Sequence, residues 1–416
     1  MSVAGRSLAG RRRVTVRPRR ACMVAYSFYE NDGRVIRYAE SLAKEGWIVD
    51  AIVLGRAGQA KSEVLGGVQV VRIQKREKTE KTRLRYLLRI VRFVARSTVE
   101  ITRRHLIGGG YDLVHVHSVP DFAVFSALVP KLTGAKVILD IHDIVPEFYA
   151  AKFGIKENSI VVDLLKFVER LSVAFSDHVI AANSLWARRL IARSARADRC
   201  STFINYPNLS VFRPELRTRS QDGRLVILYP GSLGWHQGVD LGIRAIEVVR
   251  EILPQVQFHI YGEGGVRHHL AELIKDLNLH DQVTIHDPLP IQEIALVMAN
   301  ADLGIVPKRD DSFGGQAFST KILEFMAVKV PLVIADTEID RLYFDESMVR
   351  FFKSGDALDL GRVIIDAVRD GAASTRRVER ARRFVEENCW ERRSGEYLAL
   401  IAGLLGELGE SQHAPP

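Results

Sequence analysis

The sequence is poor in cysteine and has no long apolar run. Its three cysteines, Cys22, Cys200 and Cys389, are odd in number and far apart. This pattern excludes a disulfide framework and a zinc site of paired cysteines, and it is typical of a reducing compartment. No apolar stretch approaches the roughly 20 residues that a helix needs to cross a bilayer. Because the arginine-rich start is not followed by an apolar segment, we expect no secretory signal, and therefore a cytoplasmic protein.

Acidic residues are scarce in two segments, although the formal charge of the 416-residue chain is only +9. Residues 1–20 hold seven arginines and no acid, and residues 75–105 hold eleven lysines and arginines against three glutamates. The rest of the chain is therefore net acidic. We expect residues 1–20 to be a disordered basic tail, with an organellar transit peptide as the alternative. Any attraction to an anionic surface is expected to come from these two segments.

The second basic segment has the spacing of an amphipathic helix. Within residues 80–105, apolar side chains recur every three or four positions among arginines that include Arg85, Arg89 and Arg92. Such a helix can lie on anionic lipid headgroups at the inner face of the cell membrane. Alternatively, it packs on the core and its arginines are solvated. Nucleic acid is not an expected partner, because the segment has only Tyr86 and Phe93 as aromatic residues and no nucleic-acid-binding motif.

The pattern of apolar runs predicts two α/β domains. Short β-branched runs alternate with amphipathic helical stretches, and the alternation restarts after a linker at 203–223 that contains proline and asparagine. This indicates parallel, doubly wound sheets, whose ligands bind beyond the carboxyl ends of the strands, here in an interdomain cleft. The expected divisions are a tail at 1–20, an N-terminal Rossmann-like domain at 21–205, a C-terminal Rossmann-like domain at 206–385, a helix at 386–408 that can pack back on the N-terminal domain, and a disordered tail at 409–416.

Glycine-rich turns follow two strands of the second half. The stretch "YPGSLGWHQG" contains Gly231 and Gly234, and "IYGEGG" contains Gly262. Free backbone N–H groups in such turns, together with the positive end of a helix, can bind phosphate oxygens. Neither turn has the spacing of a dinucleotide fingerprint. An ordinary strand-to-helix turn is the alternative interpretation of each.

The stretch "FGGQAFSTKILEFMAVKVPLVIAD" at 313–336 carries a stronger signal. Gly314 and Gly315 allow the backbone to approach a ligand, and Ser319 or Thr320 suits the N-cap of the following helix. Lys321 lies in the first turn of that helix, where the helix dipole disfavours a cation. A cation in this position is therefore expected to meet a bound anion.

A lone carboxylate follows in the same helix. Glu324 lies between Leu323 and Phe325 in an apolar stretch. Burying a carboxylate is costly unless it is hydrogen-bonded, and the vicinal hydroxyls of a ribose would satisfy both oxygens. The alternative is a structural glutamate bonded to a nearby backbone N–H or lysine. Lys308 and Arg309, at the end of the preceding strand, are expected to converge on the same region.

These segments, in this order, resemble the retaining glycosyltransferases of family 4. The stretches "YDLVHVHS", "ILYPGSLGWHQGVDLGIRA" and "AFSTKILEFMAVKVPLV" match that family's pattern, and the similarity covers most of residues 21–405. The resemblance implies the GT-B fold, in which two Rossmann-like, doubly wound domains face each other across a cleft. It also implies a nucleoside-diphosphate sugar as donor and co-substrate, with no further cofactor and no metal ion.

The resemblance assigns roles to residues of the second half. Glu324 falls on the second glutamate of the family's E-x7-E motif, which binds the donor ribose, whereas the first position holds Gln316. Many members have a lysine before the last glycine of the first turn, where it meets the diphosphate. That position is Gln237 here, so Lys308 and Lys321 are the expected compensating cations, with His236 as a further candidate.

The resemblance also assigns residues of the first half to the cleft. Gly33 lies in the turn that approaches the donor diphosphate. His117 matches the histidine at a strand end beside the transferred sugar, and His115 points to the same face of that strand. His142 and Asp143 end the next strand on the acceptor side. The expected catalytic residues are His117, Lys321 and Glu324.

The implied reaction moves a hexose from the diphosphate to a hydroxyl with its anomeric configuration retained. The departing phosphate oxygen takes the acceptor proton on the same face of the sugar, so no protein nucleophile is needed. The basic helix suggests a lipid-linked saccharide as acceptor, as in cell-surface polysaccharide synthesis. Two alternatives stay open: an epimerase of similar fold that acts on the donor alone, and a non-catalytic nucleotide-sugar-binding paralogue, suggested by Gln316.

Overall fold

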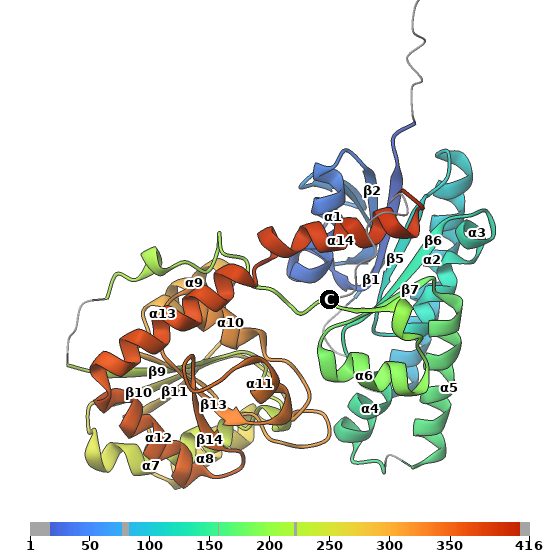
Figure 1. Ribbon diagram of the computed structural model, residues 1–416. Helices are drawn as coiled ribbons and strands as arrows, with labels where there is room; N and C mark the ends of the chain where they lie inside the picture. Colours follow the sequence, from blue (N-terminus) through green and yellow to red (C-terminus); the bar gives the residue numbers. More distant parts are fainter. Residues whose placement is uncertain (1–16, 77–82, 157, 220–222, 408–416) are drawn as a thin grey trace, which may run out of the picture.

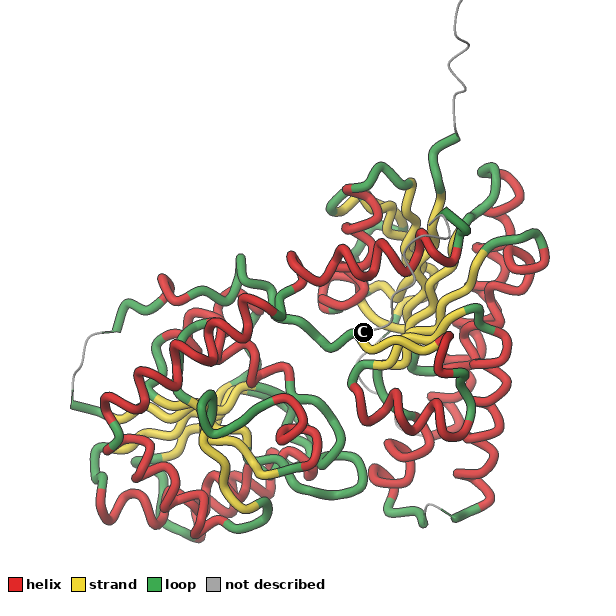
Figure 2. The backbone as a smooth tube through the Cα atoms, viewed as in Figure 1, coloured by secondary structure: helices red, strands yellow, loops and turns green. Residues whose placement is uncertain are grey.

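The computed structural model describes residues 17–76, 83–156, 158–219 and 223–407. The chain forms two α/β domains, each with its own twisted sheet covered by helices (Figures 1 and 2). The two-domain, doubly wound architecture expected from the sequence is confirmed. Within these ranges, no helix combines the length and apolar character needed to cross a membrane.

The N-terminal sheet has eight strands in the order β3-β4-β2-β1-β5-β6-β7-β8. Only β3 runs antiparallel to its neighbour, and its pairing with β4 was not predicted. The central strands are buried along their length, which explains their continuous apolar runs. The strands are β1 (Arg20–Phe28), β2 (Ile48–Gly55), β3 (Ser62–Leu65), β4 (Val68–Lys75), β5 (Leu113–His117), β6 (Lys136–Ile141), β7 (His178–Ala181) and β8 (Cys200–Thr202).

The helices of this domain largely follow the apolar pattern. The apolar spacing of the stretch "DFAVFSALVPKL" at 121–132 predicts one continuous helix. The structure instead has a 3-10 turn, η2, followed by a short α-helix, because Pro130 cannot donate inside a longer α-helix. The helical elements are η1 (Tyr29–Asn31), α1 (Gly33–Lys44), α2 (Arg83–Ile107), η2 (Asp121–Ala127), α3 (Leu128–Leu132), α4 (Val145–Phe153), α5 (Ile160–Phe175), α6 (Ser184–Arg193) and η3 (Ala197–Arg199).

The C-terminal sheet is parallel throughout, in the order β11-β10-β9-β12-β13-β14. Its strands are β9 (Leu225–Pro230), β10 (Val256–Tyr261), β11 (Val283–His286), β12 (Leu303–Val306), β13 (Leu332–Asp336) and β14 (Arg350–Lys353). Its helical elements are η4 (Pro214–Leu216), η5 (Trp235–Gln237), α7 (Val239–Ile252), α8 (Arg267–Asp276), α9 (Ile291–Ala299), α10 (Thr320–Ala327), α11 (Glu338–Tyr343), α12 (Ala357–Arg369) and α13 (Gly371–Glu387).

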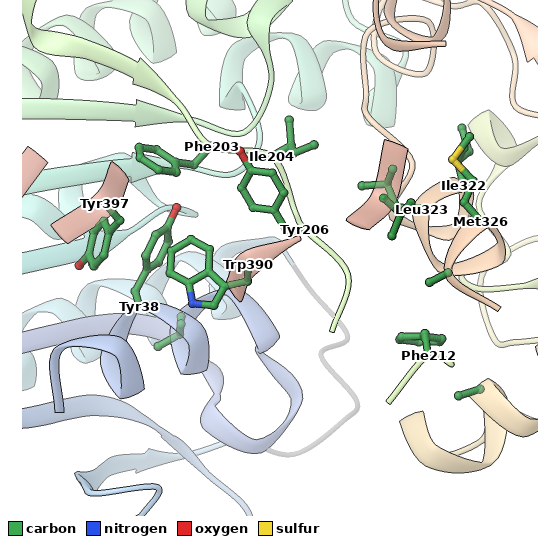
Figure 3. Packing of buried hydrophobic residues seen from close by; sticks show 14 of the residues in the cluster. Tyr38, Phe203, Ile204, Tyr206, Phe212, Ile322, Leu323, Met326, Trp390 and Tyr397 are labelled. Carbon is green, nitrogen blue, oxygen red and sulfur yellow. The ribbon is translucent and has the colours of Figure 1, made fainter. Parts of the chain in front are cut away.

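The last helix, α14 (Trp390–Leu404), crosses from the C-terminal domain and packs on α1 of the N-terminal domain (Figure 1). The Trp390 indole Nε1 donates to Ser41 Oγ at 2.9 Å. Figure 3 shows Tyr38, Trp390 and Tyr397 pointing toward one another in this contact. The same apolar cluster continues into α10, so one core ties the two domains together.

Both predicted tails fall mainly outside the described residues. This holds for residues 1–16 of the basic tail and for all of 409–416. The last part of the basic tail belongs to the fold, because Arg20 starts β1 and its backbone N–H donates to Asp112 Oδ2 at 2.8 Å. Arg17 forms an ion pair with the same carboxylate at 2.7 Å.

Candidate active site

Lys321, in the first turn of α10, passes over the glycine turn that follows β9. Its Nζ donates to Gln237 Oε1 at 3.4 Å and lies 5.3 Å from the centre of the Tyr229 ring. A Cβ on Gly231 would lie 2.2 Å from the Lys321 Cε, and Gly231 has a φ of +140°, so glycine is required there. Lys321 therefore puts a cation beside the turn where Gln237 supplies none.

The second glycine turn packs directly against the first. A Cβ on Gly262 would lie 1.8 Å from the carbonyl oxygen of Gly231. This close approach alone explains why position 262 requires a glycine, so the residue is not evidence for a bound ligand. A Cβ on Gly234, Gly314 or Gly315 would likewise meet protein atoms within 3 Å, whereas one on Gly33 would meet nothing within 4 Å. The space beside Gly33 is thus open at the N-terminus of α1.

Glu324 is partly exposed, whereas Leu323 before it is fully buried. The apolar surroundings raise the pKa of Glu324, against the opposing effects of Lys321, of a hydrogen bond with Thr320, and of Arg37 on α1. Burial also lowers the pKa of Lys321, although Glu324 favours its charged form. The carboxylate is therefore accessible to a ligand, yet its surroundings strengthen any hydrogen bond that it makes.

Two buried polar atoms just before and at the start of α10 lack partners among the described residues. Ser319 occupies the N-cap position, but its Oγ makes no capping bond. The side-chain oxygen Oε1 of Gln316 is also unsatisfied. Buried polar atoms are normally hydrogen-bonded, so unsatisfied ones mark a place where a polar ligand can bind.

Lys308 lies beneath this loop. Its Nζ pairs with Asp340 at 2.9 Å and donates to the Ala317 carbonyl oxygen at 2.8 Å. The lysine is buried, and its charge is already neutralised. Arg309 is held in a bidentate ion pair with Asp240. Arg309 also contacts the glycine turn, since its Nη1 donates to the Trp235 carbonyl oxygen at 3.1 Å, but Asp240 already pairs with its charge. Of the three expected cations, Lys321 therefore reaches the turn without an ion pair in the described structure, and Lys308 supports the loop that carries Gln316.

In the N-terminal domain, a cluster of buried polar side chains is built around Asp140 on β6. Arg34 of α1 donates to both of its carboxylate oxygens at 2.7 Å. His117 Nδ1 and His142 Nε2 lie 3.2 Å and 3.1 Å from Oδ2. Although burial acts to raise it, the pKa of Asp140 lies well below its usual value because these groups stabilise the carboxylate. Asp140 is thus a buried anion that orients both histidines.

His117 ends β5 with one ring nitrogen free. Burial lowers its pKa, against the effect of Asp140, so the imidazole is neutral at neutral pH. The contact with the Asp140 carboxylate places the proton on Nδ1. The buried Nε2 then carries a lone pair and has no partner in the described structure. It is suited to accept a hydrogen bond from a hydroxyl group of a ligand.

His115 lies behind His117 and has a structural contact. The two rings stack with centroids 4.3 Å apart, and His115 Nδ1 lies 2.9 Å from the Tyr397 hydroxyl of α14. Ligand atoms of His115, His117 and Asp140 approach one another closely enough for a metal ion. A metal ion would compete with Arg34, which already binds both oxygens of that carboxylate.

The other residues predicted for the acceptor side follow β6. His142 is partly exposed and bonds Asp140, as described above. Burial raises the pKa of the neighbouring Asp143, against the effect of His142. Both lie in the turn that leads into α4.

The loop that carries Gln316 also joins the two domains. Asn183 of the N-terminal domain donates from Nδ2 to the Gln316 carbonyl oxygen at 3.0 Å. Phe313 inserts between the N-terminal rings of Phe148 and Trp186, at centroid distances of 5.1 Å and 5.9 Å. The loop that precedes α10 is therefore held by contacts with both domains.

Replacing Asp140 by alanine should destabilise the fold by about 3 kcal/mol or more, because it leaves the buried Arg34 guanidinium unpaired. Urea unfolding measures the loss. The pKa of Asp140 is lower in the folded protein than in the unfolded chain, so its ionised form stabilises the fold at pH values above the unfolded pKa. The difference in free energy of unfolding between wild type and variant should therefore shrink as the pH falls below about 4. Asp198→Ala, in the exposed Arg196–Asp198 pair, is the control and should change stability little. Equal effects of the two variants would contradict this description of the cluster.

Several residues of this site were not predicted. They are Arg34, Arg37, Asp140, Asn183 and Phe313. Asp140 had a usable signal, because it is an acid inside the apolar run "KVILDI", and the argument applied to Glu324 applies to it equally. No signal in the sequence marked Phe313 and Asn183, since their role depends on how the two domains contact each other.

Family models match both domains. The model for the glycosyl transferase 4-like domain matches residues 34–205, and that for glycosyl transferases group 1 matches residues 215–384. A curated relative is the 2-deoxystreptamine N-acetyl-D-glucosaminyltransferase of Niallia circulans, 24% identical over 54% of this chain and 58% of its own length. In these matches the chain spans about a third to three fifths of the length of the curated relatives.

Solved structures share the fold. Sucrose-phosphate synthase from Thermosynechococcus elongatus has a TM-score of 0.77 at 18% identity, and the match covers 94% of this chain and all of that one. HepE of Anabaena, crystallised with UDP and glucose, has a TM-score of 0.72 at 14% identity, over 92% of this chain and all of that one.

The fold and the matched domains define a GT-B protein built of two Rossmann-like domains. The chain belongs to the glycosyltransferases of the family 4 type. The expectations from the sequence about fold and family are confirmed.

Proposed function

We propose that this protein transfers a hexose from a nucleoside-diphosphate sugar to a hydroxyl acceptor with retention of the anomeric configuration. The observation that carries the proposal is a group of polar atoms around the start of α10 that can bind a ligand. Lys321 reaches the glycine turn, Gln316 Oε1 and Ser319 Oγ are unsatisfied, and the Glu324 carboxylate is accessible beside them. A diphosphate and a ribose would satisfy these groups together.

In this assignment the nucleotide binds to the C-terminal domain. The two ribose hydroxyls donate to Glu324, and Lys321 and Ser319 contact the diphosphate. The crystal of HepE with UDP and glucose supports a donor of this class. Because Gln316 is neutral, it can hydrogen-bond a sugar hydroxyl through either side-chain atom but adds no negative charge.

The N-terminal wall then holds the transferred sugar. A hydroxyl of the sugar donates to the free Nε2 of His117, which Asp140 keeps in the required tautomer. His142 and Asp143 lie on the side from which the acceptor approaches. These contacts orient the sugar without any covalent bond to the protein.

The transfer step needs no protein nucleophile. The acceptor oxygen forms its bond to the anomeric carbon as the bond from that carbon to the phosphate oxygen breaks, on the same face of the sugar. The acceptor proton passes to the departing phosphate oxygen. Negative charge grows on the diphosphate, so Lys321 and the N–H groups of the glycine turns stabilise the transition state more than the ground state. A metal ion is not required by this scheme.

A thermal-shift screen of nucleoside diphosphates and their sugars, with and without a chelator, tests the proposal. One diphosphate should raise the melting temperature by mass action, and the chelator should not abolish the shift. Incubation of the donor alone separates the alternatives, because an epimerase converts it without an acceptor. If only the Gln316→Glu variant turns over, the wild-type chain is a non-catalytic binder.

For the acceptor we propose a lipid-linked saccharide at the inner membrane surface, as used in cell-surface polysaccharide synthesis. Helix α2 supports this, because it has two apolar faces. One face, with Ile90 and Phe93, packs on the core, as one interpretation of the sequence expected. The other exposes Leu88 and Val91 beside the exposed Arg92, as the membrane interpretation expected.

Changing Arg85, Arg89 and Arg92 to glutamate should release the protein from vesicles rich in anionic lipid, because each basic residue near such a surface contributes about 1 kcal/mol. Vesicle flotation measures the bound fraction. The control is the same charge reversal on α13 of the other domain, at Arg376, Arg380 and Arg383. Equal loss with both triple variants, or no loss with either, would exclude docking through α2.

A further inference from the structure

Helix α5 has an exposed apolar stripe that neither the fold nor the proposed transfer reaction uses. Ile160, Leu164, Phe167 and Leu171 are 88%, 60%, 53% and 46% exposed. Their spacing of four, three and four residues is that of the contact positions of a coiled coil. Isolated exposed apolar side chains are ordinary, but a continuous stripe of them marks an interaction surface.

The opposite face of α5 is firmly attached to its own domain. Val162, Glu169 and Val173 are buried on that face. Glu169 accepts hydrogen bonds from Arg193 Nε at 2.8 Å and from Ser194 Oγ at 2.7 Å, both at the end of α6. The outward stripe is therefore not a consequence of a loosely packed helix. Its orientation is fixed, with the apolar positions held toward the outside of the molecule.

We propose that this stripe is the contact surface of a homodimer, in which α5 packs antiparallel against α5 of a second copy around a two-fold axis. In that arrangement Leu164 lies opposite Phe167 of the partner subunit, and Ile160 lies opposite Leu171 of the partner subunit. Each contact occurs twice, as a two-fold axis requires. The proposal does not depend on the transfer reaction.

The charges beside the stripe favour this partner and this direction. Asp163 and Arg170 are exposed and occupy the same flank of the stripe, seven residues apart. Within the chain, Asp163 pairs with Lys166 at 3.6 Å and Arg170 Nε donates to the Arg193 carbonyl oxygen at 3.2 Å. In the antiparallel pair, Asp163 lies next to Arg170 of the partner subunit, and the reverse pair forms by symmetry. On the other flank, Val161 and Val168 extend the apolar contact. A parallel pair would place Asp163 against a valine, so only the antiparallel pair is complementary in charge.

A lipid surface fits this face less well than a second copy does. Helices that lie on anionic membranes have basic residues on their flanks, as α2 has. On α5, one flank of the stripe has Asp163 together with Lys166 and Arg170, and the other flank has two valines and no basic residue. An acid that faces anionic headgroups would be repelled, whereas an opposite charge on a second copy would pair with it.

The surroundings of α5 allow such a dimer. The apolar surface continues past the end of the helix, where the Phe175 ring meets the partly exposed Phe125 of η2 at a centroid distance of 5.2 Å. Figure 1 shows α5 on the side of the N-terminal domain that faces away from the C-terminal domain. A second copy on α5 would therefore lie on the far side of this domain from the C-terminal domain.

Light scattering coupled to size-exclusion chromatography, over a range of concentrations of the full chain, tests the proposal. The wild-type protein should have the mass of a dimer, and Phe167→Glu should have the mass of a monomer. Asp163→Arg and Arg170→Asp should each weaken dimerisation at least tenfold. The variant that carries both changes restores the charge pairs in swapped form and should return to within about threefold of wild type. Circular dichroism and the melting temperature show that each variant is folded.

The matched control for charge is the α2 triple variant, which should remain a dimer. A wild-type protein that is monomeric at every concentration would overturn the proposal. So would a double charge variant that dimerises as weakly as either single one. A monomer that binds lipid vesicles and loses this binding with Phe167→Glu would show that the stripe contacts lipid instead.

Discussion

Replacing Glu324 by alanine should lower kcat/KM at least about 100-fold. The carboxylate is proposed to accept a hydrogen bond from each of two ribose hydroxyls, and hydrogen bonds to a charged group contribute about 1.5–3 kcal/mol each. Steady-state kinetics with the donor identified by the thermal-shift screen measure the loss. The affinity for the nucleoside diphosphate, measured by calorimetry, should fall with it, because the contact is to the nucleotide and not to the transferred sugar.

Two variants sharpen this test. Glu324→Gln keeps the shape and one acceptor oxygen, so its loss should be intermediate. Glu379→Ala removes a glutamate that forms an exposed pair with Lys329, and it should leave kcat/KM unchanged. If Glu324→Ala transfers sugar at the wild-type rate while binding nucleotide normally, the ribose does not contact this residue.

Lys321→Ala should lower kcat by roughly 100-fold, because losing one preorganised group that stabilises the leaving diphosphate costs about 3 kcal/mol. The structure offers a specific rescue. Lys321 Nζ lies 3.4 Å from Gln237 Oε1, so adding Gln237→Lys to the Lys321→Ala variant returns a cation to the same place. This double variant should recover part of the lost rate. Lys329→Ala, just beyond the other end of α10, is the matched control and should retain full activity.

The pH profile gives an independent check on Lys321. Burial lowers the pKa of this ammonium group below its ordinary value. The charged form is the active one, so kcat/KM should fall as the pH rises through that lowered pKa. Lys321→Arg keeps the charge at all accessible pH values, and the fall should move to higher pH. A fall at the same pH in this variant would assign the titration to another group.

The larger elements were predictable because their apolar periodicity is strong. The apolar runs "ACMVAYSF", "YDLVHVHS" and "RLVILYPG" predict buried strands, and β1, β5 and β9 occur there. The helical spacing from Gly33 to about Lys44 and in "VDLGIRAIEVVREI" predicts helices, and α1 and α7 occur there. The predicted helix over 121–132 failed locally, because a proline interrupts a pattern that is otherwise helical. Strand β3 was missed, since its four residues alternate between exposed and partly buried positions and give little apolar signal.

The part of the site in the C-terminal domain was predictable, because its residues lie close together in the sequence. Glu324 and Lys321 share one turn of helix, so their proximity follows from spacing alone. The ion pair of Arg34 with Asp140 joins residues more than 100 positions apart, and no periodicity relates them. Lys308 was predicted to face the donor because it ends a strand. The structure instead directs it inward to Asp340, a residue whose burial the sequence did not indicate.

The most direct test of the central claim is a crystal structure of this protein with the nucleoside diphosphate that gives the largest thermal shift. The proposed function predicts ribose hydroxyls within hydrogen-bonding distance of the Glu324 carboxylate, and phosphate oxygens at Lys321 and the Ser319 Oγ. Nucleotide bound elsewhere, or in this cleft with its ribose turned away from Glu324, would contradict it.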